Sequence, residues 1–237
     1  MKRSFLLAFF GATLFLSAQN SSSWQQHVDY TMDVQMDVKT YQYTGTQKLV
    51  YSNNSPDDLN RVFYHLFYNA FQPGSEMDIR LQNIKDPDKR MVENGESRIA
   101  SLSESEMGYL NAKSLTQDGQ PVSFTEEGTI LVVDLAKPIP AGGKTTLEMT
   151  FEGQVPLQIR RSGRNSKENV ALSMSQWYPK LSEYDFEGWH PNPYIAREFH
   201  GVWGDFDVKI TLDKDYTVGG TGYLQNPQEI GHGYETP

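Results

Sequence analysis

Histidine and carboxylate side chains are the residue types in this sequence that could bind a metal ion or transfer protons. Glu198 and His200 stand two positions apart, with His190 upstream, so a small metal cluster of these three side chains is conceivable. The pattern H-E-x-x-H, the helical pair that holds a zinc ion, does not occur. The alternative is that these are polar residues of a loop or sheet surface. His65 lies in an apolar run and is expected to be a hydrogen-bonded core histidine.

Another group of acidic residues lies within the aromatic stretch 177–203. Glu183, Asp185 and Glu187 alternate along the chain, and two carboxylates that flank a sugar can hydrolyse a glycosidic bond. A solvated acidic strand has the same pattern, and spacing in the sequence does not fix the separation of two carboxylates in space. A solvated acidic strand is therefore the preferred interpretation of this pattern, and the glycosidase hypothesis is the weaker one.

Composition excludes several other kinds of site. The 237 residues contain no cysteine, which excludes a disulfide scaffold, a thiolate zinc site, an iron–sulfur cluster and a cysteine nucleophile. The formal charge of −9 argues against binding of nucleic acid, which depends on clusters of Lys and Arg. No G-x-S-x-G or phosphate-binding loop occurs, and the GGTG run at 219–222 is interpreted as a turn at a strand end because no helix is expected after it.

The elements that must position these residues are predicted to be β-strands. Apolar and polar residues alternate over 28–38, which predicts a strand with one face in water, and 41–51 repeats the pattern around Gly45. The denser apolar run 61–71 predicts a strand buried on both faces. No window carries a sustained helical pattern, and the polar segment 73–108 is predicted to be a long loop. Further strands are predicted at 109–115, 122–124, 129–135, 145–151, 170–174, 205–212 and 217–222, with a hairpin turn at Asp118-Gly119.

This pattern predicts an all-β protein, an antiparallel β-sandwich or saddle-shaped sheet. Residues 24–237 are predicted to form one domain, since no repeat or linker divides them. Residues 1–18 are interpreted as a cleaved signal peptide, because Lys2 and Arg3 precede an apolar run that ends at Ser17-Ala18. That run is shorter than the ~18 apolar residues that span a bilayer. We expect a secreted or periplasmic protein without a membrane anchor.

One segment gives a more specific indication of function than composition or periodicity does. The run SMSQWYP at 173–179 resembles the strand that reads threonine, glutamine, aromatic, glutamate, proline in the aminopeptidase N family, the gluzincin zinc metallopeptidases. The segments 64–71, 135–153, 198–199, 204–212 and 216–222 also fit that family, in particular its secreted bacterial branch. The resemblance covers about residues 24–224.

The resemblance implies that the chain is the N-terminal β-saddle domain, which packs over a thermolysin-like catalytic domain. Carried over by position, Gln176 and Tyr178 would help to hold the free α-amino group of a peptide substrate. Residues two apart on a strand share a face, and the Gln176 carbonyl can accept a hydrogen bond from an ammonium group. Tyr178 departs from the family's Glu or Gln, and a phenol adds no negative charge. The alternative for Gln176 is that it only satisfies a backbone group.

The family's G-x-M-E-N and H-E-x-x-H segments do not occur, so we expect this chain to be the front portion of a longer exported enzyme. No cofactor is expected in this chain, and zinc is expected in the absent catalytic domain. Without zinc there is no activated water, so the 237 residues are predicted to be inactive alone. The expected partners are the N-terminus of a peptide substrate and the C-terminal catalytic domain of the same protein.

The other function considered is a stand-alone secreted β-sandwich module that binds carbohydrate or protein. It would use the aromatic side chains of Trp177, Trp189 and Trp203. Ordinary packing in the core and loops is the preferred interpretation of these tryptophans.

Overall fold

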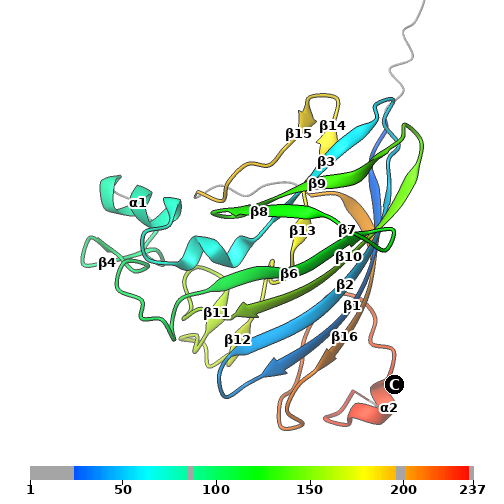
Figure 1. The fold of residues 1–237 in the computed structure, drawn as a ribbon. Helices are drawn as coiled ribbons and strands as arrows, with labels where there is room; N and C mark the ends of the chain where they lie inside the picture. The colour runs from blue at the N-terminus through cyan, green and yellow to red at the C-terminus, as the bar shows by residue number, and fades with distance from the viewer. Residues whose placement is uncertain (1–23, 85–87, 196–200, 235–237) are drawn as a thin grey trace, which may run out of the picture.

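The computed structural model describes residues 24–84, 88–195 and 201–234. The signal peptide predicted at 1–18 lies outside these ranges, as do Glu198 and His200 of the proposed metal cluster. Within the described residues, β-strands are far more extensive than helices, as predicted (Figure 1). None of the described helices is long and apolar enough to cross a membrane.

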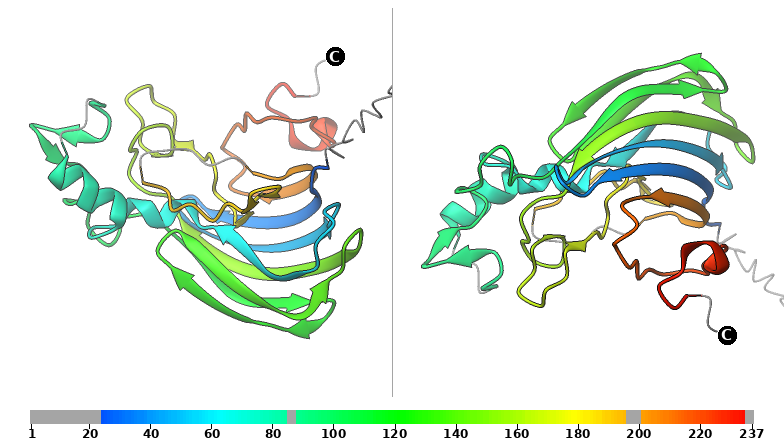
Figure 2. Two further views of the ribbon diagram at one scale, coloured as in Figure 1. Left: turned by 90° about the horizontal axis from the view of Figure 1, so that it is seen from above. Right: turned by 90° about the horizontal axis from the view of Figure 1, so that it is seen from below.

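The larger sheet has six strands and is strongly curved (Figures 1 and 2). All of its neighbouring pairs are antiparallel except the edge pair β16 and β1, which is parallel. In spatial order the strands are β16 (Trp203–Thr211), β1 (His27–Asp37), β2 (Gln42–Ser52), β10 (Lys144–Gln154), β6 (Tyr109–Gln117) and β7 (Gln120–Pro121).

Alternating residues of β1 bury one face of this sheet. Val28, Tyr30, Met32 and Val34 are at most 3% exposed, which confirms the period of two read from the sequence. The hairpin predicted around Asp118-Gly119 is also confirmed. It joins β6 to β7 through two residues with φ of 47° and 80°, the left-handed values of a tight hairpin turn.

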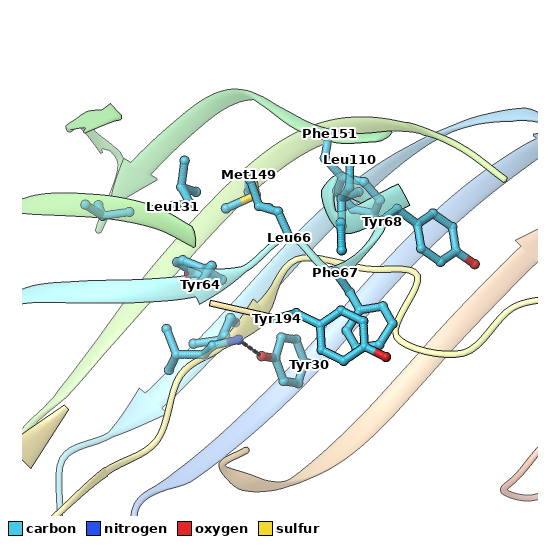
Figure 3. Packing of buried hydrophobic residues seen from close by; sticks show 14 of the residues in the cluster. Tyr30, Tyr64, Leu66, Phe67, Tyr68, Leu110, Leu131, Met149, Phe151 and Tyr194 are labelled. Carbon is cyan, nitrogen blue, oxygen red and sulfur yellow. Dashed lines mark hydrogen bonds between the residues drawn. The ribbon is translucent and has the colours of Figure 1, made fainter. Parts of the chain in front are cut away.

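A second sheet of four strands shares its core with the first. Its order is β13 (Lys180–Leu181), β3 (Leu59–His65), β9 (Ile130–Ile139) and β8 (Ser123–Glu127). Figure 3 shows Tyr64 and Leu131 of this sheet in the same cluster as Met149 and Phe151 of the six-stranded sheet. One continuous core between two sheets is the organisation of a β-sandwich.

The short strands form three small hairpins. These are β4 (Val92–Glu93) with β5 (Glu96–Ser97), β11 (Gly163–Arg164) with β12 (Leu172–Ser173), and β14 (Tyr184–Asp185) with β15 (Gly188–Trp189). Near the C-terminal end of the described chain lies a four-residue helix, α2 (Pro227–Ile230).

Two expectations for residues 61–108 were wrong. The strand predicted at 61–71 ends at His65, and the rest of the apolar run forms a fully buried 3-10 helix, η1 (Phe67–Phe71). The segment predicted to be only loop contains a helix, α1 (Glu76–Asn83), whose N-cap Ser75 accepts a hydrogen bond from the backbone of Asp78. This helix buries Met77 and Leu81, one turn apart.

Two predicted strands are also different in the structure. The strand predicted at 170–174 is reduced to Leu172–Ser173. Residues 217–222 form no strand and pair with no strand of the described chain. At Gly219 and Gly220, no other part of the described chain lies within 4 Å of the position that a Cβ atom would occupy. A strand needs a neighbouring strand for its backbone hydrogen bonds. No strand of the described chain lies beside this segment.

Candidate functional site

Residues 173–181 contain the motif that predicts a substrate-binding role, and three buried side chains of the large sheet hold them in place. Tyr43 donates a hydrogen bond to the carbonyl oxygen of Trp177 at 2.5 Å, and Gln47 donates to that of Pro179 at 2.9 Å. The backbone N–H of Leu181 donates to the Tyr30 hydroxyl at 2.9 Å. The three anchoring side chains belong to β1 and β2 and point to the inner face of the sheet.

Gln176 does not lie on a strand, so the predicted strand geometry was wrong. Its φ is 58°, in the left-handed region, and residues 174–179 have no strand pairing. The neighbouring Ser175 is fixed by Ser162, whose Oγ lies 2.6 Å from the Ser175 Oγ. The half-buried Gln176 side chain makes no hydrogen bond to any residue that the structure describes. Its amide therefore satisfies no backbone group in the described chain.

Tyr178 lies in an aromatic cluster. Its ring packs edge-on against Tyr30, Trp177 and Phe206, with ring centroids 5.4 to 5.9 Å apart. Burial raises the pKa of Tyr178 to about 12, so the phenol is neutral at physiological pH. Gln176 and Tyr178 thus lie two positions apart on one anchored segment, but they do not share a strand face.

The hairpin of β14 and β15 contains a group of acidic and histidine side chains that could hold a metal ion. The Nε2 of His190 lies 2.8 Å from the Oδ1 of Asp185. Possible ligand atoms of Asp185, Glu187 and His190 all lie within 4.8 Å of one another. His190 was expected beside Glu198 and His200, which lie outside the described residues, and the structure places it beside two residues of the proposed acidic group instead.

Glu183, the third member of that acidic group, is buried next to the hairpin. Its residue is 8% exposed, and the backbone N–H of His190 donates to its carbonyl oxygen at 3.0 Å. Burial, and next the negative charge of Asp185, raise the pKa of the Glu183 carboxyl. A buried carboxyl with a raised pKa is found at acid–base sites, and it is equally a consequence of packing.

Tyr184 and Trp189 of this hairpin pack on each other, whereas Phe186 in its turn is 86% exposed. The ring of Trp189 lies 5.2 Å from that of Tyr184 and 5.6 Å from that of Phe63. Trp177 packs against Tyr43, whereas Trp203 is 71% exposed. The interpretation of these tryptophans as ordinary packing is therefore confirmed for Trp177 and Trp189 but not for Trp203.

A group that the sequence analysis did not identify lies on the outer face of β1 and β16. The Nε2 of His27 is 3.2 Å from Asp29 and 3.4 Å from Asp205, and the two aspartates lie directly opposite each other. The His-x-Asp spacing within β1 is visible in the sequence, and a strand was predicted at 205–212, but the pairing that sets Asp205 opposite Asp29 was not. His65 is buried in β3, as expected, at 1% exposure.

Comparisons with known proteins found similarity to solved structures at low sequence identity. No family model matches the chain, and no curated protein matches it. A solved structure of an M1 zinc metallopeptidase mutant from Deinococcus radiodurans, bound to a Tyr-Ser-Ala substrate, is 13% identical, with a TM-score of 0.45 and 85% of this chain covered. Another structure of the M1 zinc metallopeptidase from that organism is 12% identical, with a TM-score of 0.42 and 85% of this chain covered.

A two-domain M1 zinc metallopeptidase mutant bound to L-tryptophan is 14% identical, with a TM-score of 0.39 and 78% of this chain covered. The chain spans about a third of the length of these structures, at 36%, 35% and 32%. These three solved structures are M1 zinc metallopeptidases, members of the aminopeptidase N family.

Proposed function

We propose that this chain is the N-terminal, non-catalytic β domain of an exported zinc metallopeptidase. In this role it covers the active-site cleft and helps to bind the free N-terminus of a peptide substrate. The observation that carries the proposal is the state of Gln176. Its amide makes no hydrogen bond to the described chain, although it belongs to a segment that three buried side chains hold in place.

The geometry of this segment suits recognition of an ammonium group. The Gln176 carbonyl oxygen can accept a hydrogen bond from the α-ammonium of a peptide, which has three donors. A hydrogen bond to a charged group contributes about 1.5–3 kcal/mol. Tyr178 can add a hydroxyl acceptor but no negative charge, because burial keeps its phenol neutral. The contact would therefore depend on hydrogen bonding more than on charge pairing.

The chemistry of hydrolysis would lie outside these residues. When bound, a catalytic zinc ion activates a water molecule and polarises the scissile carbonyl. The sequence has no H-E-x-x-H, so we assign the zinc to a catalytic domain of the same protein. The residues described here would bind and orient the substrate terminus.

The first experiment is to read the coding sequence downstream of Pro237. We expect an open reading frame that encodes H-E-x-x-H. A stop codon directly after Pro237 would contradict the proposal and favour a stand-alone binding module.

The second experiment measures hydrolysis of a free-amine peptide amide by the full-length enzyme. Gln176→Ala is expected to raise KM about tenfold and to change kcat little, since about 1.4 kcal/mol of binding corresponds to a factor of ten. Gln35→Ala, which removes an exposed glutamine of β1, is the matched control and should leave KM unchanged. Equal KM values for the Gln176→Ala variant and the wild type would remove Gln176 from the site.

A further inference from the structure

Arg164, the second residue of β11, is a buried cation that has no acidic partner among the residues that the structure describes. Its residue is 7% exposed, and it forms no ion pair with any carboxylate of the described chain. One Nη atom donates to the carbonyl oxygen of Ser105, and the buried Nε has no hydrogen-bond partner among the described residues. Buried arginines are normally paired, because removing an unpaired charge from water is costly.

The neighbours of Arg164 compensate its charge only in part. The guanidinium carbon lies 4.1 Å from the centroid of the Tyr41 ring, a cation–π contact. The nearby carboxylate of Glu106 is occupied by the backbone N–H and hydroxyl of Ser103, at 3.0 and 2.8 Å. These hydrogen bonds are the main cause of the lowered pKa of Glu106, and the charge of Arg164 contributes least. A guanidinium has five donors, so most of those of Arg164 lack an acceptor in the described chain.

Arg164 lines a hollow of about 560 Å³ where β2 begins and β10 ends. Lys39 provides a second cation, and Glu104 is the one carboxylate in the lining. The amides of Gln42 and Gln154 close one wall, because Gln42 donates to Gln154 and Gln154 donates to backbone carbonyls. Two cations, Arg164 and Lys39, thus line this hollow, in a protein whose overall charge is strongly negative.

We propose that this hollow, the Arg164 pocket, binds a small oxyanion, either inorganic phosphate or a carboxylate. The planar fork of an arginine matches two oxygens of either group, and the guanidinium of Arg164 lies over the Tyr41 ring. Lys39 adds a point charge to the same anion. The proposal does not depend on the role assigned to Gln176, because it uses none of the same residues.

The test is titration of the 237-residue chain with sodium phosphate and, separately, with N-acetylglycine, at pH 7 and constant ionic strength set with sodium chloride. Binding is measured from amide chemical shifts of residues that line the pocket. At least one anion is expected to saturate, and which one does so distinguishes phosphate from a carboxylate. Shifts that do not saturate with either anion would overturn the proposal.

Three variants test whether the anion binds in the Arg164 pocket. Arg164→Lys keeps the charge but loses the fork, and it is expected to weaken binding at least tenfold. Lys39→Met should weaken it about two- to fivefold. Lys167→Met removes an exposed charge outside the lining and should bind like the wild type. An unchanged affinity in Arg164→Lys overturns the proposal, and if that variant does not fold, an unchanged affinity in Lys39→Met overturns it instead.

Discussion

The ring of Tyr43 on β2 covers Gly153, the residue directly opposite it on β10. A side-chain carbon at Gly153 would overlap the ring of Tyr43, so the space that a larger residue would need is already filled. The same arrangement occurs where Phe151 of β10 covers Gly45 of β2. Because the Tyr43 hydroxyl also reaches the carbonyl of Trp177, Gly153 contributes to the position of the candidate site.

Gly153→Ala is expected to lower the free energy of unfolding by about 1–3 kcal/mol, because the added methyl group forces the buried Tyr43 ring to move. Urea denaturation gives this value. Gly219→Ala is the control, since no part of the described chain lies within 4 Å of the added carbon, and it should change stability by less than about 0.5 kcal/mol. Equal effects at the two glycines would contradict the packing described here.

Tyr43→Phe keeps the ring over Gly153 and removes only the hydrogen bond to Trp177. We expect a loss of about 1 kcal/mol in unfolding free energy and faster amide exchange within residues 174–181. Tyr64→Phe is the matched control, because the buried Tyr64 hydroxyl has no hydrogen-bond partner in the described chain, and its removal should cost nothing. Unchanged exchange in the Tyr43→Phe variant would show that this anchor does not hold the segment.

Glu183→Gln should stabilise the protein more at pH 7.5 than at pH 4.5. Burial raises the pKa of Glu183 in the folded state above the value of about 4.3 expected for the unfolded chain. The unfolded state then binds fewer protons, so the contribution of Glu183 to stability falls as pH rises through the folded-state pKa. A glutamine at position 183 is neutral at both pH values, so the variant does not undergo this loss of stability.

Thermal unfolding of the Glu183→Gln variant and the wild type at the two pH values measures the difference. Glu187→Gln makes the same change of charge at an exposed position of the same hairpin and serves as the control. A melting temperature for Glu183→Gln that is below wild type by the same amount at both pH values would exclude the predicted cost of the buried charge.

The backbone at Gln176 gives a prediction about stability alone. Its φ of 58° is unfavourable for a residue with a Cβ, so Gln176→Gly should be about 1 kcal/mol more stable than Gln176→Ala. At Gln35, in the extended strand β1, the order should reverse, with glycine less stable than alanine. Chemical denaturation of the four variants checks both signs, and the same order at both sites would contradict the left-handed conformation of Gln176.

The strands with one face in water and one in the core were predictable because their signal is local. Val28, Tyr30 and Met32 are buried by the same period of two that is visible in the sequence. The apolar run that becomes η1 was not predictable in this way, because a fully apolar segment has no period to distinguish a strand from a helix. The helix α1 had a usable signal in Ser75 and the acidic Glu76 and Asp78 after it, a typical helix start.

The candidate site was predictable in its residues but not in its geometry. Gln176 and Tyr178 were identified from a motif, yet the conformation of their segment depends on Tyr30, Tyr43 and Gln47. These side chains lie more than 130 positions earlier in the chain, and no spacing in the sequence connects them to it. The unpaired state of Arg164 was hidden for the same reason, since it depends on which carboxylates the fold leaves out of reach.

The parallel pairing of β1 with β16 also affects how the chain can fold during synthesis. Asp33 and Lys209, which form an ion pair across these strands, lie 176 positions apart. At a translation rate of about 5–20 residues per second, β1 leaves the ribosome on the order of ten seconds or more before β16. During that interval its open backbone edge can pair with another nascent chain. The yield of folded protein should therefore depend on how well the cell keeps emerging chains apart.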